Sequence, residues 1–193
     1  MRQLAFGFIL ALAAFGQPVH PTRPVDAREF AVMAWGDSPS DMQQLRLMRE
    51  AGLNISGFCR TADLDRVAAA GLTCFVSDER ANGYDWAQLP PDAELRKNVA
   101  ELAKQVGSSP AMLGFFLTDE PHASLMPGLG KVAALLREAL PGKMPYVNLF
   151  PYRVTPDRLG TPDYDAYVRM LVDTIHQPFL SYDNYSLVNG EML

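Results

Sequence analysis

The stretch GFFLTDEPH, residues 114–122, carries two adjacent carboxylates, Asp119 and Glu120, at the end of a strongly apolar segment. An apolar strand holds the backbone rigidly, so the Glu120 side chain would meet the mouth of a cavity in half-apolar surroundings. Such surroundings raise the pKa of a carboxyl group, as a general acid requires. Neighbouring strand residues face opposite sides, so both acids share one site only if the strand ends there. Pro121, which lacks a backbone N–H, favours that ending.

Strand-like segments alternate with helical segments along the chain, and these elements would position the two acids. The expected strands are 30–39 (ending in a turn), 53–59, 72–79, 111–118, 144–150 and 178–185. The expected helices are 40–52, capped by Ser40, then 61–71, then 91–107, capped by Asp92, and finally 129–140 and 162–176. This order predicts an α/β fold with a parallel sheet and right-handed crossovers.

Two α/β architectures fit this order: an open doubly wound sheet and a (β/α)8 TIM barrel. A nucleotide-binding open sheet usually has a Gly-rich first turn. Here the first turn is WGDSPSD, residues 35–41, without G-x-G-x-x-G or a phosphate-loop lysine. This favours the barrel, although a flavodoxin-like sheet needs no such motif. In either fold the carboxyl ends of the strands build the site.

The expected strand ends carry acids, amides and aromatic rings. Carboxylates and amides hydrogen-bond hydroxyl groups, and aromatic rings stack on the apolar faces of sugars, so we expect an oligo- or polysaccharide substrate. No set of Lys and Arg converges there, which argues against phosphate. With Glu120 as the catalytic candidate, the substrate-binding candidates are Asp119, Trp35, Asp37, Asp78, Asn148, Tyr182, Asp183 and Tyr185. An isolated Asp in a loop is more often a cap or turn residue, and this alternative stays open for Asp37, Asp78 and Asp183.

The N-terminus has the features of an export signal. Arg2 precedes an apolar block at residues 4–15, which is too short to span a bilayer, and small residues follow at Ala14 and Gly16. We therefore expect a signal peptide at 1–16, an extended leader at 17–29 and the domain at 30–193. The protein would be secreted or periplasmic, with no membrane association after cleavage; an uncleaved N-terminal anchor is the alternative.

Composition narrows the classes of ligand. The net charge of −5 and the lack of a basic run give no reason to expect nucleic acid. The three histidines are isolated in sequence, so we expect no metal, and no motif calls for a cofactor. Cys59 and Cys74 are expected on neighbouring parallel strands, four residues apart in height. That is about 13 Å, too far for a disulfide, so two buried thiols are expected.

The segment LGFFLTDEP resembles the end of strand four in the retaining glycoside hydrolases of the (β/α)8 superfamily clan A, including relatives of the family 42 β-galactosidases. There an Asn-Glu-Pro usually stands, and its Glu is the general acid/base. The resemblance implies that Glu120 protonates the leaving glycosidic oxygen and later activates water. It also implies that Asp119, at the usual Asn position, holds a sugar hydroxyl. Trp35 and the segment 182–185 resemble the sugar-stacking positions of such barrels more loosely.

The same resemblance places the nucleophile on a Glu at the end of strand seven. The sequence has about six βα units, so we expect an incomplete barrel and a truncated chain. The 193 residues alone are expected to be poorly stable and unable to perform retaining hydrolysis.

Three functions fit these observations, and they are given in decreasing order of support from the sequence. The first is a secreted glycoside hydrolase of the retaining type, or the N-terminal part of one. The second is a non-catalytic carbohydrate-binding barrel that keeps the cavity. The third is another exported α/β hydrolase; it ranks low because G-x-S-x-G is missing and Ser181 has no evident histidine partner.

Overall fold

A computed structural model describes residues 30–107, 109–185, 187–188 and 191–192, the last two pairs by their backbone only. Residues 31–193 form one compact unit. The expected signal peptide and leader lie outside the described residues. In the part of the chain that is described, no helix combines the length and apolarity needed to cross a bilayer.

Four parallel strands form the central sheet in sequence order, β1 (Ile55–Cys59), β2 (Thr73–Val76), β3 (Met112–Asp119) and β4 (Met144–Asn148). The expected first and sixth strands run beside its two edges as isolated parallel bridges. Met33 and Asp37 bridge to β1, and Leu149 bridges to Tyr182. The predicted α/β class with a parallel sheet is therefore confirmed.

Two glycines explain why the first segment is not a continuous strand. Gly36 has φ +116° and Gly57 has φ +103°, conformations that L side chains rarely adopt. A Cβ on Gly57 would lie 2.4 Å from the carbonyl oxygen of Gly36. The close approach depends on glycine, and the pairing of β1 shifts register between Ile55 and Phe58. A separate antiparallel pair, β5 (Leu187–Val188) and β6 (Glu191–Met192), ends the described chain.

Five longer helical segments follow the prediction. They are α1 (Met42–Glu50), η2 (Thr61–Asp63) with α2 (Leu64–Ala69), α4 (Asp92–Val106), η3 (Ala123–Leu125) with α5 (Met126–Ala139), and α7 (Tyr164–Ile175). The predicted caps differ: Asp41 rather than Ser40 caps α1, and Asp92 is the first residue of α4, with no capping hydrogen bond. Two four-residue helices, α3 (Glu79–Asn82) and α6 (Pro156–Leu159), were not predicted because one turn is too short to show periodicity.

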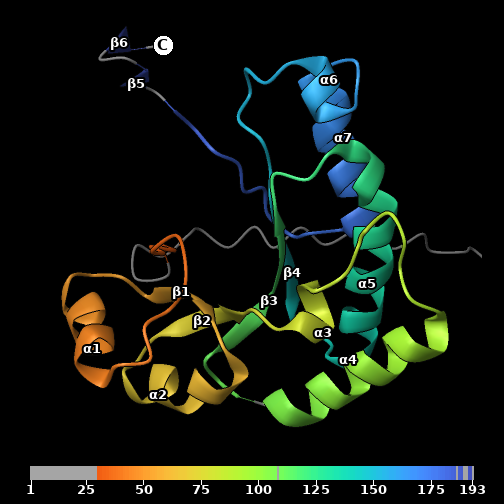
Figure 1. The fold of residues 1–193 in the computed structure, drawn as a ribbon. Coiled ribbons are helices and arrows are strands. Elements are labelled where there is room, and N and C mark those ends of the chain that lie inside the picture. Colours follow the sequence, from red (N-terminus) through yellow and green to blue (C-terminus); the bar gives the residue numbers. More distant parts are fainter. Residues whose placement is uncertain (1–29, 108, 186, 189–190, 193) are drawn as a thin grey trace, which may run out of the picture. The chain divides into compact units, whose positions relative to one another are not determined.

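The two faces of the sheet differ in what covers them. One face packs against the helices, and Figure 1 shows α1, α2, α4, α5 and α7 along that side. The other face holds a smaller, aromatic cluster with Ile55, Phe58, Phe75 and Tyr146 at its centre. Within the described residues, no helix contributes to this second cluster. The apolar second face is thus partly open: Phe116 stacks on Phe58, and Trp35 meets both rings edge-on.

The expectation of two free thiols is wrong, because Cys59 and Cys74 form a disulfide with a Cα–Cα distance of 6.1 Å. Ile55 pairs with Thr73, which reduces the expected height difference from four residues to three. The extra residue of β1 between Ile55 and Phe58 removes one more, so Cys59 pairs with Val76. The remaining offset of two residues lies within the reach of a disulfide.

Candidate active site

The chain turns sharply after β3, at the two acids. Asp119 is the last residue of β3 and pairs in register with Asn148 of β4. Glu120 follows with φ +43°, a left-handed conformation that is uncommon for a residue other than glycine. Its N–H donates to the carbonyl oxygen of Asn148 at 2.9 Å. Because the strand ends here, Asp119 and Glu120 both reach the carboxyl edge of the sheet.

Asn148 is the centre of a hydrogen-bond network and is only 2% exposed. Its Nδ2 donates to Oδ1 of Asp119 at 3.0 Å and to Oδ1 of Asp183 at 2.9 Å. Its Oδ1 accepts from the hydroxyl of Ser181 at 2.7 Å. That bond uses the single hydroxyl hydrogen of Ser181. The Tyr146 hydroxyl, 2.9 Å away, therefore donates to the Ser181 oxygen. The buried amide therefore joins two carboxylates from different segments.

Glu120 completes a group of three carboxyls with Asp119 and Asp183, which we call the acid cluster. Burial, a hydrogen bond with Asp183, and the charges of Asp119 and Asp183 raise the pKa of Glu120. Arg158 opposes this, with its Nη2 at 3.7 Å from Oε2 of Glu120. A raised pKa is the property that a carboxyl group needs to act as a general acid.

The segment after α7 brings Asp183 to the acid cluster. Leu149 donates its N–H to the carbonyl of Ser181 at 2.9 Å, and Asp183 donates its N–H to the carbonyl of Leu149 at 3.1 Å. Ser181 and Asp183 both contact Asn148, while Tyr182 between them is half exposed. The hydroxyl of Tyr185 donates to Oδ2 of Asp183 at 2.9 Å, and its ring is exposed.

Trp35 lies on the open face of the sheet and is 52% exposed. Its ring meets those of Phe58, Phe116 and Tyr146 edge-on, at centroid distances of 5.1, 6.2 and 6.4 Å. Tyr146 is also the tyrosine that donates to Ser181 in the network. The expected stacking residue and the acid cluster are therefore connected through one buried tyrosine.

Asp78 has the contacts of a capping residue. It accepts from the backbone N–H of Arg80, at the start of α3, and forms two further hydrogen bonds with its guanidinium group at 2.8 Å. Those bonds outweigh burial and lower the pKa of Asp78. Asp37 bridges to Phe58 and lines a hollow with Ser38, Ser40, Arg60 and Ser77. Both acids lie at the ends of the first segment and β2, in hollows not lined by the acid cluster.

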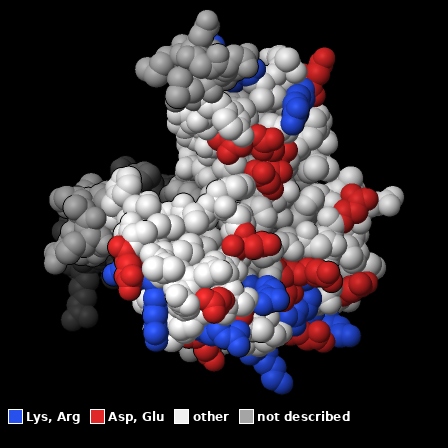
Figure 2. Space-filling view, turned by 60° about the vertical axis from the view of Figure 1, so that its left-hand side comes forward, with Lys and Arg blue, Asp and Glu red and all other residues white. Residues whose placement is uncertain are grey.

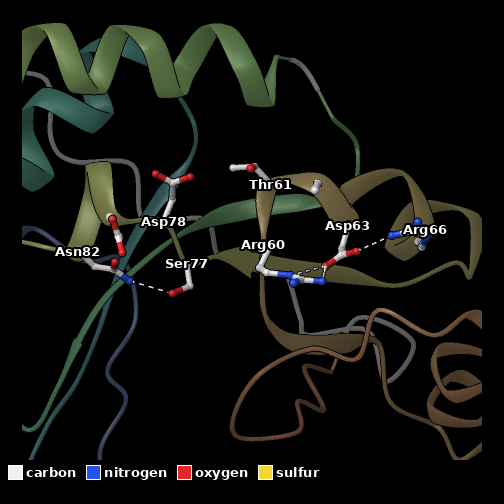
Figure 3. Close-up of a pocket in the computed structure, with 9 residues that line it drawn as sticks. Arg60, Thr61, Asp63, Arg66, Ser77, Asp78 and Asn82 are labelled. Carbon is white, nitrogen blue, oxygen red and sulfur yellow. Dashed lines mark hydrogen bonds and ion pairs between the residues drawn. The ribbon is translucent and has the colours of Figure 1, made fainter.

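A buried acid that was not predicted, Asp63, lines the same hollow as Asp78 (Figure 3). It is 1% exposed and accepts from Ser40 at 2.8 Å, from Arg60 at 2.9 Å and from Arg66 at 2.7 Å. Burial disfavours its charge, but these three hydrogen bonds outweigh burial and lower its pKa. We call this group the Asp63 cluster; its charges are mutually satisfied.

Three residues of the acid cluster's surroundings were missed as site residues: Tyr146, Ser181 and Arg158. The period of two along a strand could have linked Ser181 to Asp183. No such pattern exists for Arg158, which lies on α6 and stacks its guanidinium over the Phe150 ring at 5.0 Å. The position of α6 depends on Gly160, since a Cβ there would lie 2.4 Å from the His122 ring.

Charge is distributed unevenly over the surface. Figure 2 shows acidic side chains gathered in the upper half of one face, whereas Lys and Arg alternate with acids along its lower edge. Among the described residues, no group of three or more His, Cys, Asp or Glu is arranged to hold a metal ion. The acid cluster offers carboxylate oxygens that can accept hydrogen bonds from hydroxyl groups, and one carboxyl, Glu120, whose pKa is raised.

Comparisons with known proteins give a fold and no family. No protein-family model matches the sequence, and no curated protein matches it. Among solved structures, the β-1,4-mannanase of the common sea hare Aplysia kurodai matches with a TM-score of 0.51 and 11% identity, over 76% of this chain and 63% of the mannanase. The endo-1,4-β-mannanase of Eisenia fetida matches with a TM-score of 0.51 and 14% identity, over 76% and 61%.

Over the matched part, the fold of this chain is similar to that of the two mannanases. At these identities the likeness concerns the fold alone, and it gives family 42 no separate support. The chain spans less than two thirds of the length of either mannanase.

Proposed function

We propose that this protein is a glycoside hydrolase, with its sheet forming part of a (β/α)8 barrel and Glu120 acting as general acid/base. The observation that carries the proposal is the acid cluster at the carboxyl end of β3, where the buried Asn148 amide joins Asp119 to Asp183 and burial raises the pKa of Glu120. In a parallel α/β fold this edge of the sheet is where catalysis takes place. The glycosidase-like fold supports the same conclusion.

The substrate contacts would come from the residues around Glu120. Asp119 and Asp183 can accept hydrogen bonds from sugar hydroxyls, because each carboxylate has acceptor capacity beyond its bond from Asn148. The exposed rings of Trp35, Tyr182 and Tyr185 can stack on sugar faces. Asp37 lines a hollow that the acid cluster does not line, so it would bind only a part of the substrate away from Glu120. The contacts of Asp78 support a capping role.

Retaining hydrolysis also needs a nucleophilic carboxylate about 5 Å from the acid. Asp183 is the third member of the acid cluster, and both of its carboxylate oxygens accept hydrogen bonds, from the Asn148 amide and from the Tyr185 hydroxyl. We therefore assign the nucleophile to no described residue. The same observation favours the second candidate function, a barrel that binds carbohydrate without hydrolysing it.

Export is part of the proposal. The N-terminal apolar block is followed by a domain whose two cysteines form a buried disulfide. Disulfides persist in oxidising compartments such as the bacterial periplasm and the cell exterior. A secreted or periplasmic location fits a polysaccharide substrate.

The test is Glu120→Gln in the purified protein, with reducing-sugar release measured on a panel of polysaccharides that includes β-1,4-mannan. Loss of a general acid should lower kcat by about 10²–10⁴-fold while sugar binding, measured by calorimetry, is retained. An aryl glycoside with a good leaving group needs little protonation, so its cleavage should fall less. Glu138→Gln, an exposed glutamate paired with Arg96, is the matched control.

Unchanged turnover by Glu120→Gln would rule out its role as the acid. If neither the wild type nor the variant turns over and both bind sugar, the result favours the binding function over hydrolysis by this chain.

A further inference from the structure

Arg158 places a positive charge beside the carboxyls of the acid cluster, and no step of the proposed reaction uses it. Its Nη2 lies 3.7 Å from Oε2 of Glu120, an ion pair beyond the usual hydrogen-bond distance. Among the described residues, Arg158 is the one cation in an ion pair with a member of the acid cluster. Its side chain is 65% exposed, and its guanidinium donates no hydrogen bond to any of these residues.

Packing holds the guanidinium of Arg158 in this place. Its central carbon lies 5.0 Å from the centre of the Phe150 ring, which is buried. A guanidinium over an aromatic face is attracted by the ring and keeps the N–H groups at its edges free. The short helix α6, which carries Arg158, ends at Gly160, where a side chain would collide with the His122 ring. The N–H groups are therefore held near Glu120 and are available to a ligand.

The charges around Glu120 restrict which ligand group can lie at Arg158. The carboxylates of Asp119 and Asp183 accept hydrogen bonds, so they suit sugar hydroxyls and repel an anion. An arginine has donors alone, in a planar fork that matches a pair of anionic oxygens. A sugar that contacts Glu120 has its ring substituents next to this fork. An anionic substituent would be paired there, and a neutral hydroxyl would gain only a weaker bond.

We propose that Arg158 selects acidic sugars: its guanidinium binds the carboxylate of a uronic acid, or the sulfate of a sulfated sugar, on the unit that contacts Glu120. The proposal rests on the proposed function and deepens it by naming the substrate class, an acidic polysaccharide. The net charge of −5 repels a polyanion from the molecule as a whole. A local cation is therefore needed to bind such a chain at the acid cluster.

The experiment measures sugar binding to the whole protein by isothermal titration calorimetry, in a Glu120→Gln background that prevents hydrolysis. β-1,4-Mannotetraose and β-1,4-tetramannuronate differ only at C6, which carries a hydroxymethyl group in the first and a carboxylate in the second. Oligomers of galacturonate and glucuronate widen the set of uronic acids. A galactan, with and without sulfate esters, tests sulfate in place of carboxylate.

Arg158→Gln should weaken binding of the preferred acidic sugar by about 10- to 100-fold, because charge-assisted hydrogen bonds are lost. Binding of mannotetraose should stay unchanged. Arg158→Lys keeps the charge without the planar fork, so it should restore only part of the affinity. Arg153→Gln is the matched control, since Arg153 is an exposed arginine of the same loop without an ion pair to the acid cluster among the described residues.

A preference for the uronates would assign carboxylate as the ligand, and a preference for the sulfated galactan would assign sulfate. The proposal is overturned if no acidic sugar binds more tightly than its neutral counterpart, or if Arg158→Gln and Arg153→Gln weaken acidic binding equally. Binding is measured without turnover, so this failure is distinct from a failure of the proposed function. Turnover of neutral mannan that depends on Glu120, with no preference for acidic sugars, would keep the proposed function and overturn this proposal.

Discussion

The Asp63 cluster and the acid cluster both lie at the ends of strands in the same sheet, yet their charges are arranged in opposite ways. In the Asp63 cluster a buried carboxylate is surrounded by Arg60, Arg66 and Ser40. In the acid cluster the buried centre is the neutral amide of Asn148, and carboxyls surround it. In the first group the carboxylate is paired with opposite charges, whereas the second concentrates carboxyls of one sign.

The two arrangements have opposite effects on protonation. Hydrogen bonds lower the pKa of Asp63 in spite of burial, while burial and neighbouring carboxyls raise the pKa of Glu120. A disulfide joins β1 to β2 beside the Asp63 cluster. We therefore interpret the β1–β2 half as a stabilising element. We interpret the β3–β4 half as the functional site, because groups with perturbed pKa values cluster at such sites.

The largest expected effect comes from the disulfide and tests whether the β1–β2 half stabilises the fold. The cysteines are separated by 15 residues, and opening a loop of that size costs about 3 kcal/mol of unfolding free energy. Urea denaturation of the wild type with and without reductant measures this difference. A Cys59→Ala/Cys74→Ala double variant is the control, because reductant should not change its midpoint. An equal response of both proteins would show that the disulfide does not contribute.

The next effect is that of Asp63→Asn, which should lower the free energy of unfolding by about 2 kcal/mol at neutral pH because charge-assisted hydrogen bonds are lost. A lowered pKa contributes stability above the unfolded value that is lost as pH falls. The deficit relative to wild type should therefore shrink below pH 3.8. Asp65→Asn, an exposed acid two residues away, should change stability little. A deficit that persists unchanged in acid would contradict the electrostatic explanation.

The smallest effect has the opposite sign and is the sharpest test of the comparison. Glu120→Gln should raise the free energy of unfolding by about 0.5 kcal/mol at neutral pH, the size typical of partly exposed charges. Because the pKa of Glu120 is raised on folding, the wild type loses stability as pH rises from 4.5 towards that higher value. The advantage of the variant should grow over the same range. Thermal melts from pH 4 to 8 measure this difference in stability. Destabilisation by Glu120→Gln would contradict the contrast between the acid cluster and the Asp63 cluster.

The strand and helix order could be predicted because it depends on local patterns. Alternating apolar segments, and helices with regular apolar faces such as α4 and α7, are written in neighbouring residues. The grouping of the strand-end residues can then be predicted, because parallel strands bring their carboxyl ends to one edge of the sheet. This is why Asp119, Asn148 and Asp183, taken from three segments, were expected together and are joined in the structure.

Predictions that depended on register or on loop position could not be made in the same way. The disulfide was missed because one extra residue in β1 changes the height of Cys59. Asp78 has the same residue type and strand-end position as Asp183, and only Arg80 distinguishes its role. Arg158 reaches Glu120 from a four-residue helix with no pattern of its own.

The sequence by itself determined the α/β order, the end of β3 at Asp119 and the set of acids at the carboxyl edge, because these depend on residues close together in the chain. Only the tertiary structure decided which acids are neutralised. Coulomb and hydrogen-bond energies depend on separations of a few ångströms between distant residues. That is why the pKa of Asp63, which is bound by two arginines, is lowered, and the pKa of Glu120, which is partly buried among carboxyls, is raised.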